Sequence, residues 1–386
     1  MKKSILLGSA AALVAVTGAQ AADLPVVEPV DYVKVCDAFG AGFHYIPGTE
    51  TCLKFSGRVR AEIGVRGGED FVEEDETTYL NSNFELVVNA SSMTEVGMLV
   101  GQFAISGSNE GTVGLGDAWI SIGENILVGR ETSRFDFGGG YGIFAGLYED
   151  EALNQFTFIM PFGNGVSMTL GLEDGRDRRV AIAVQSTTGS TFSSTGTYGG
   201  MEIPDVVASL RVSQGWGSAQ ISGALHQIRA DSDGVNDDLD EDFGFAIQAG
   251  AELNVGAMTK IKVVGGYADG ALHYVGGGNA PVFEATMNIA TNTITDTLEG
   301  WYVLAGLSHD FSDQLNIGVT GSYHDFEDQL ETWNLGATVA YEVVDNLTVS
   351  VAAQYTDVEF DNTPALNVNG GETDTWEARL RVQRDF

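Results

Sequence analysis

The sequence is poor in basic residues and contains none of the motifs by which enzymes are commonly recognised. It has 19 lysines and arginines against 54 aspartates and glutamates, which gives a formal net charge of -35. Nucleic acid is bound by clustered Lys and Arg, so this composition excludes it as a partner. There is no HExxH, Walker or GxSxG motif, and the five histidines are scattered singly. We therefore expect no enzyme activity, no cofactor and no metal site.

Long apolar runs are also missing, except for one at the N-terminus. Lys2 and Lys3 precede an apolar run from Ile5 to Val16, and residues 19–21 (Ala-Gln-Ala) supply the small side chains that a signal peptidase needs. The run is too short for a membrane-spanning helix, which takes about 20 apolar residues. We predict a signal peptide over residues 1–21, with a buried N-terminal helix as the alternative. The remaining sequence predicts no membrane-spanning helix.

Only two cysteines occur, Cys36 and Cys52, and there is no CxxC motif. In an exported protein such a pair favours a disulfide over a metal or catalytic site. The intervening residues contain glycines and Pro47, which let the chain fold back into a small hairpin. We expect residues 22–53 to form an N-terminal segment with a Cys36–Cys52 hairpin, preceding the main domain at 54–386.

From residue 54 onward the sequence alternates between apolar and polar side chains. In 54–66 one face carries apolar residues (Phe55, Val59, Ala61, Ile63 and Val65), and the other carries polar ones (Lys54, Ser56, Arg58, Arg60 and Glu62). This period of two is typical of a β-strand. The same pattern predicts sixteen strands, near 54–66, 77–91, 95–106, 112–122, 125–135, 154–162, 165–174, 206–214, 218–229, 242–253, 257–268, 299–309, 314–325, 331–343, 346–358 and 374–386.

The connections and the strand faces predict what kind of β-protein this is. Short turns alternate with long polar connections, which run from about 175 to 205, 230 to 241, 269 to 298 and 359 to 373. That sorting is typical of a transmembrane barrel, with short periplasmic turns and long outer loops. In the last strand Trp376, Leu380 and Val382 alternate with charged residues, and a polar inner face implies a water-filled lumen. We predict an all-β, sixteen-stranded antiparallel transmembrane barrel.

Several blocks of sequence resemble the alphaproteobacterial general porins. They are residues 33–60 (VKVCDAFGAGFHYIPGTETCLKFSGRVR), 126–137 (ILVGRETSRFDF), 171–175 (GLEDG), 204–227 (PDVVASLRVSQGWGSAQISGALHQ) and the closing LRVQRDF. The resemblance implies a homotrimer in the outer membrane of a Gram-negative bacterium, through which small hydrophilic solutes and ions diffuse passively. It also implies that the third outer loop folds inward. The terminal Phe386 is similar to the signal that the barrel-assembly machinery recognises.

The segment from Asn125 to Leu153 departs from the alternation, and we expect it to carry the constriction. A barrel this wide is not filled by its own side chains, so an inward loop at 136–153 would set the aperture. The loop carboxylates Glu149, Asp150 and Glu151, with Asp136, would then face basic wall residues, a recurrent selectivity device. These wall residues are Arg58, Arg60, Arg130, Arg211, Lys260, Lys262, Arg379 and Arg381. The alternatives are a solvated outer loop and arginines paired with wall acids such as Glu62 or Glu377.

The same sequence is compatible with alternative functions and with several partners. A substrate-specific channel, for example for a sugar, or an outer-membrane adhesin or structural barrel could share the fold. Residues 231–242 are acidic, yet the position of Gly234 does not fit a calcium loop, and a solvated outer loop near lipopolysaccharide is the alternative. Ala22-Asp23 is a candidate for attachment to peptidoglycan. The excess of acid predicts mild cation selectivity.

Overall fold

The computed structural model describes residues 34–69, 77–148, 150–185, 192–231, 239–361 and 370–386. The predicted signal peptide, the Ala22-Asp23 pair, Glu149 and most of the acidic segment 231–242 lie outside the described residues. Within the described ranges, no helix is both long and apolar enough to cross a membrane.

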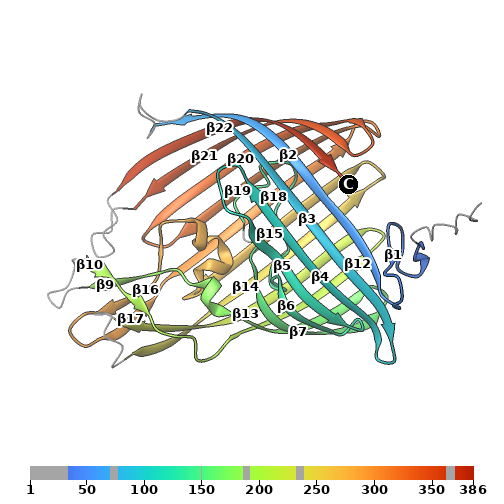
Figure 1. The fold of residues 1–386 in the computed structure, drawn as a ribbon. Helices are drawn as coiled ribbons and strands as arrows, with labels where there is room; N and C mark the ends of the chain where they lie inside the picture. Colours follow the sequence, from blue (N-terminus) through green and yellow to red (C-terminus); the bar gives the residue numbers. More distant parts are fainter. Residues whose placement is uncertain (1–33, 70–76, 149, 186–191, 232–238, 362–369) are drawn as a thin grey trace, which may run out of the picture.

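Sixteen antiparallel strands form a closed barrel (Figure 1). They are β2 Cys52–Gly68, β3 Thr78–Thr94, β4 Gly97–Ser108, β5 Gly114–Ile122, β6 Ile126–Thr132, β7 Ala152–Gly163, β8 Val166–Glu173, β12 Asp205–Gln214, β13 Gly217–Asp231, β14 Asp240–Val255, β15 Thr259–Asp269, β18 Glu299–Asp310, β19 Leu315–Phe326, β20 Leu330–Val344, β21 Leu347–Phe360 and β22 Gly371–Asp385. Each strand pairs with the next along the chain, and β22 pairs with β2 to close the ring. The predicted fold class is confirmed, with strand ends that differ by a few residues.

The alternation in the sequence separates an apolar outer surface from a polar interior. Along β20, Trp333, Leu335 and Val339 are exposed on the outside, whereas the intervening Thr332 and Asn334 are buried inside. Tilted aromatic pairs, such as Trp301 with Tyr323 and Trp333 with Tyr355, lie on the same outer face. An apolar outer surface with aromatic residues suits a lipid environment.

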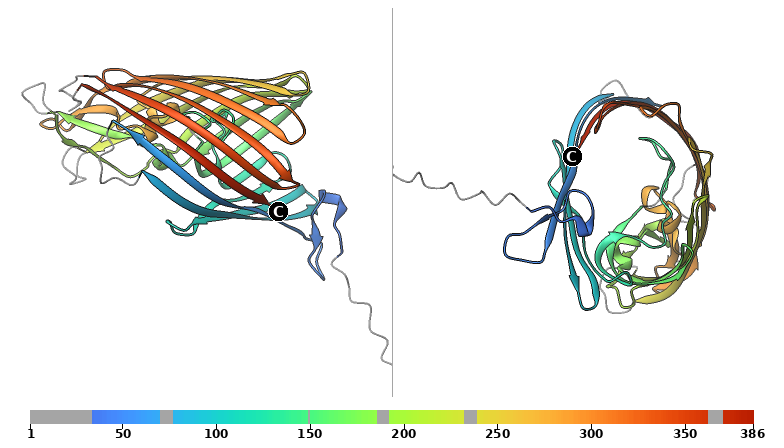
Figure 2. Two further views of the ribbon diagram at one scale, coloured as in Figure 1. Left: turned by 90° about the horizontal axis from the view of Figure 1, so that it is seen from above. Right: turned by 90° about the vertical axis from the view of Figure 1, so that its right-hand side faces the viewer.

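The two ends of the barrel differ, as Figures 1 and 2 show. One end, called the turn end here, carries the chain's C-terminus and short connections, such as 164–165 and 345–346. Asn164 and Gly165 both have positive φ, the conformation of a two-residue hairpin turn that Asn-Gly favours. At this end Phe386 and Gly57 exchange backbone hydrogen bonds of 3.0 Å. The opposite end, the loop end, carries the longer connections.

Two of the long connections contain structure that their polar sequences did not predict. The connection from β8 to β12 contains η2 (Gly175–Arg178), β9 (Ala181–Gln185), β10 (Phe192–Thr195) and the short β11 (Thr197–Tyr198). The connection from β15 to β18 contains η3 (Leu272–Val275), η4 (Gly277–Asn279), β16 (Phe283–Asn288) and β17 (Thr293–Thr297). Strands β9 and β16 pair in parallel at the centre of a second, four-stranded sheet. Ile182, Val184, Ala285 and Met287 are fully buried there. Each connection supplies one half of this small apolar core, so neither half is recognisable as structured from its own sequence.

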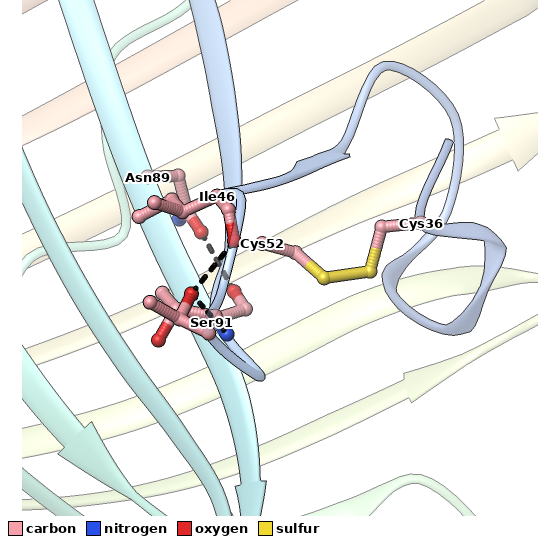
Figure 3. Close-up of a disulfide and its surroundings, with 7 residues drawn as sticks. Cys36, Ile46, Cys52, Asn89 and Ser91 are labelled. Atoms are coloured by element: carbon pink, nitrogen blue, oxygen red, sulfur yellow. Dashed lines mark hydrogen bonds between the residues drawn. A yellow bond between two sulfur atoms is a disulfide. The ribbon is translucent and has the colours of Figure 1, made fainter. Parts of the chain in front are cut away.

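A disulfide joins Cys36 to Cys52 at the turn end, with 6.2 Å between the Cα atoms (Figure 3). This confirms the predicted pairing. The enclosed chain contains η1 (Asp37–Phe39) and β1 (His44–Tyr45), which pairs with the start of β2. Phe43 packs against both cysteines, with Phe39 and Tyr45 beside it. The hairpin therefore has its own small core outside the barrel.

We predict that replacing both cysteines, in a Cys36→Ser/Cys52→Ser variant, loosens the hairpin and leaves the barrel folded. Losing a bridge of this loop length removes about 3 kcal/mol from the hairpin on the entropy model. Limited proteolysis followed by mass spectrometry should show new cuts between residues 36 and 52. A variant whose barrel no longer folds would contradict the prediction, because it would make the disulfide essential for the whole sheet.

Candidate functional site

The connection between β6 and β7, residues 133–151, crosses the interior of the barrel and is called the inner loop here. The Tyr141 N–H donates to Thr320 Oγ1 at 2.7 Å, and the Ile143 N–H donates to Thr338 Oγ1 at 2.9 Å. Thr320 lies on β19 and Thr338 on β20, on the opposite side of the ring from β6. Figure 2 shows the green loop inside the outline of the barrel, viewed from its turn end. The expected inward fold of this segment is therefore present.

Glycines allow the inner loop to lie against the far wall. A Cβ atom added to Gly140 would meet Thr320 Oγ1 at 2.2 Å, well inside contact distance. Gly142 has φ +97°, and a Cβ there would lie 2.4 Å from Thr338 Oγ1. Any larger residue would separate the loop from its anchors, which explains the glycines at 140 and 142.

Two of the predicted wall cations hold the base of the inner loop. Lys262 Nζ donates to the Gly139 carbonyl at 3.0 Å and lies 5.4 Å from the centre of the Phe137 ring. The Arg211 guanidinium lies 5.1 Å from the same ring. These cations therefore contact an aromatic face and a backbone oxygen of the loop, and in the described residues neither is bonded to a loop carboxylate. Lys260 is exposed near the turn end.

Asp136 is buried in an ion pair, which corrects the expectation that it lines the passage. Its carboxylate lies 2.9 Å from Arg178 Nη2, and both side chains have 0% exposure. Complete burial raises the pKa of the Asp136 carboxyl to about 6, although the Arg178 guanidinium acts in the opposite direction. Arg178 comes from η2 and also lies over the Tyr274 ring of η3 at 4.4 Å. The pair joins three connections that are far apart in sequence.

Further buried polar contacts surround this pair. Ser133 Oγ donates to both oxygens of Glu173, at 2.8 and 3.0 Å. The Tyr274 hydroxyl donates to Asp205, whose carboxylate also lies 2.8 Å from His226 Nδ1. We call Asp136, Glu173, Arg178, Asp205, His226 and Tyr274 the inner ion cluster. Of its members only Asp136 was predicted as a site residue from the sequence, and His226 is one of the five histidines that are scattered singly in the sequence.

His324 on β19 forms a second link between connections. Its Nδ1 lies 3.0 Å from the carbonyl oxygen of Val275, and its Nε2 lies 3.0 Å from that of Leu147. The ring stacks on Tyr302 at 5.2 Å between centroids and is almost fully buried. His324 of the wall therefore contacts both the inner loop, at Leu147, and the connection that contains η3, at Val275.

Two further loop acids, Asp150 and Glu151, lie at the C-terminal end of the inner loop. Glu151 Oε1 is 3.9 Å from Arg130 Nη2, and each side chain is about one third exposed. Arg130 also lies 3.4 Å from Asp177 of η2. Asp150 is exposed. Among the predicted loop acids and wall cations that the structure describes, Glu151 and Arg130 form a carboxylate–arginine contact.

Four predicted arginines form an ionic cluster on the inner face of β22, β2 and β3, which we call the wall cluster. Its members are Arg58, Arg60, Glu62, Glu85, Glu377, Arg379 and Arg381. Arg58 lies 2.6 Å from Glu85, and Arg379 lies 2.6 Å from Glu377. Arg381 pairs with Glu62, while Arg60 donates to Gln383. Arg58, Arg379 and Arg381 are therefore paired with acids of the same wall, which was the alternative expected from the sequence.

The tip of the inner loop reaches the wall cluster. The Arg379 guanidinium lies 4.9 Å from the centre of the Phe144 ring. Phe144 is buried, whereas Arg58, Arg379 and Arg381 keep between 15% and 36% of their side-chain surface exposed. The loop and the arginine-bearing wall are therefore in contact within one interior.

Comparison with known proteins assigns this architecture to a family. Residues 23–379 match the profile of the family described as the Porin subfamily. The chain belongs to the porin family. Porin Omp2b of Brucella canis is 31% identical over 418 aligned positions that cover 100% of this chain and 99% of that protein, and Porin Omp2b of Brucella neotomae is 32% identical over the same coverage.

Solved structures share the fold of this porin at low sequence identity. The outer membrane channel DcaP of Acinetobacter baumannii has a TM-score of 0.68 at 14% identity, covering 89% of this chain and 99% of that one. An anion-selective porin from Comamonas acidovorans has a TM-score of 0.55 at 12% identity, covering 87% and 100%. The trimer form of OmpT from Vibrio cholerae has a TM-score of 0.55 at 11% identity, covering 88% and 100%. The family match, together with this fold, makes the chain a porin channel and not an enzyme.

We predict that Arg178→Leu releases the inner loop of this porin. Removing one partner of a buried ion pair costs roughly 3–5 kcal/mol, because the remaining carboxylates stay buried without a cation. Hydrogen exchange of fragments spanning residues 134–148 should speed up strongly. Arg178→Lys keeps the charge and serves as the matched variant, with a smaller effect. Unchanged exchange in Arg178→Leu would show that the ion pair does not hold the loop.

We also predict a pH dependence that isolates Asp136. A buried acid with a raised pKa is favoured in its protonated form, so docking of the loop is strongest below about pH 4 and weakens as pH rises through 6. The change is on the order of 3 kcal/mol. Asp136→Asn does not titrate at this position. The ratio of wild-type to Asp136→Asn exchange in the loop should therefore rise between pH 4 and 6, and a flat ratio would contradict the raised pKa.

Proposed function

We propose that this porin is a general-diffusion channel whose narrowest passage lies between the inner loop and the wall cluster. The observation that carries the proposal is the position of the loop, which spans the interior and brings Phe144 to Arg379. A loop in this position reduces the aperture, because a barrel of sixteen strands is otherwise a wide aqueous channel. Small hydrophilic solutes and ions would pass through the remaining opening.

Charge on the two sides of the passage supports a transverse field. The wall cluster contains four arginines and three glutamates, so it carries a net positive charge. Asp150 and Glu151 belong to the opposing inner loop, and Glu149 lies between Tyr148 and Asp150 but outside the described residues. Opposed charges across a narrow passage orient polar solutes and disfavour apolar ones. Asp136 takes no part, because it is buried against Arg178.

We further propose how the chain is exported, oriented and assembled. Residues 1–21 would be the export signal, and the mature chain would begin at Ala22, which the intact mass of the purified protein checks. Residues 22–53 would lie on the periplasmic side, since the disulfide hairpin and the C-terminus share the turn end. The trimer form of the OmpT neighbour supports a homotrimer. Phe386 would serve the barrel-assembly machinery, the loop end would contact lipopolysaccharide, and Ala22-Asp23 would be the point of any peptidoglycan linkage.

The proposal predicts ion-conducting channels in planar lipid bilayers, with three equal sublevels for each inserted trimer. In a salt gradient the zero-current potential should indicate mild cation selectivity, because acids greatly outnumber bases. Neutralising the loop acids, in Glu149→Gln/Asp150→Asn/Glu151→Gln, should shift that potential toward anions. Neutralising Arg58 and Arg60 to Gln should shift it toward cations.

The matched control is Glu124→Gln, which removes an acid from an exposed turn at the turn end. It should leave the zero-current potential unchanged. Absence of any conductance from the folded wild type would overturn the channel function. Equal shifts from the loop variant and from Glu124→Gln would overturn only the assignment of the constriction.

A further inference from the structure

A partly open cavity of about 320 Å³ lies inside the barrel, away from the wall cluster. It is bounded by the end of the inner loop (Leu147 and Tyr148), by the segment after η3 (Ala280 and Pro281) and by inward side chains of β19, β20 and β21. Packing voids in protein interiors are rarely larger than a water molecule, so this volume is more than imperfect packing. It falls at the lower limit of volumes that hold small organic ligands.

The floor of the cavity is apolar and forms part of the main hydrophobic core of the interior. Phe326 and Leu330 are each only 1% exposed, and Val358 and Ala280 pack against the same cluster. The Phe326 ring continues a stack that begins with Tyr302 and His324. Phe326 and Leu330 support this floor from below, and Val358, Ala280 and Pro281 are the apolar side chains that keep surface open to a solute.

A few polar groups lie among these apolar walls. Thr356 Oγ1 accepts a bond from Asn334 Nδ2 at 2.6 Å, so its own hydrogen remains for donation. Thr332 Oγ1 donates to the Asp357 carbonyl at 2.8 Å, so its lone pairs remain for acceptance. Burial, with the charges of Asp150 and Asp136, raises the pKa of Tyr148, which keeps its hydroxyl neutral.

Among the residues that the structure describes around the cavity, none would neutralise a charged ligand. Neither lysine, arginine, aspartate nor glutamate is among its described lining residues. The ring nitrogens of His324 already face the carbonyl oxygens of Val275 and Leu147. A charged solute would lose hydration here without gaining a partner, which is costly.

We propose that this cavity is a binding subsite for small uncharged solutes that join an aromatic ring to a hydroxylated group, such as aryl glycosides. The ring would lie against Val358, Ala280 and Pro281. The hydroxyls would meet Thr332, Thr356 and Tyr148. The inference rests on the proposed channel function, because the solute reaches the cavity through the lumen. Such a subsite makes passage saturable for this class, whereas simple sugars and ions diffuse past it.

The test compares phenyl β-D-glucoside with methyl β-D-glucoside, which differ only in the group that would occupy the apolar floor. Isothermal titration calorimetry on the detergent-solubilised full chain should give saturable binding of the phenyl compound, at least about tenfold tighter than the methyl compound. Ala280→Leu, which fills the cavity, should weaken phenyl binding by about tenfold or more. Val358→Phe provides a second filling variant in case Ala280→Leu does not fold.

The matched control is Ala145→Leu, which adds the same atoms to the inner loop outside the cavity. It should bind the phenyl compound as the wild type does, which also accounts for partition into micelles. Equal affinity for the two glucosides, or wild-type binding by folded filling variants, would overturn the subsite. Conductance in potassium chloride, measured on the same preparations, tests the channel separately, so intact conductance without phenyl binding removes the subsite alone.

Discussion

The width of a closed sixteen-stranded barrel is the constraint on which the rest of this structure depends. The inward side chains of opposite strands cannot meet across such a ring, so only chain from the connections can narrow the water-filled interior. The inner loop crosses the interior from β6 to β19 and β20, where the hydroxyls of Thr320 and Thr338 accept hydrogen bonds from its backbone N–H groups. Loop backbone inside an aqueous barrel needs such partners, because buried N–H groups are costly to leave unpaired. The close approach in turn requires glycine at 140 and 142.

Filling the interior with connections creates a second requirement, which the inner ion cluster meets. Three connections that are distant in sequence converge at the loop end, and their polar groups are taken out of water together. Arg178 lies against Asp136 and over Tyr274, while Tyr274 donates to Asp205. A buried charge is tolerated when it is paired and hydrogen-bonded, so each segment fixes the position of the others. The wall arginines follow the same rule, since wall carboxylates lie beside them.

The sequence predicts the strands of this fold well because lipid outside and water inside impose a strict alternation. Val59 and Trp376 could be assigned to the outer face, and Arg58 and Arg379 to the inner one, from period alone. The second sheet was missed because β9 and β16 are adjacent only after the barrel has formed. For the same reason Arg178 could not be paired with Asp136, which lies 42 residues earlier. The pairing of the wall arginines with acids was foreseen as an alternative, because like charges inside one wall repel each other.

The burial of Asp136 separates two tasks that the sequence had assigned to one group of acids. Asp136 holds the base of the inner loop with a side chain that has no exposed surface. Gly140 and Gly142 allow the loop to lie against the far wall. Asp150 and Glu151 keep exposed surface, and Glu151 is near Arg130 without a short contact. A carboxylate that is completely buried and paired contributes little field to a neighbouring solution, whereas an exposed and unpaired one contributes a field that decreases with distance. The electrical character of the passage can therefore change through Asp150 and Glu151 while Asp136 and Arg178 preserve its shape.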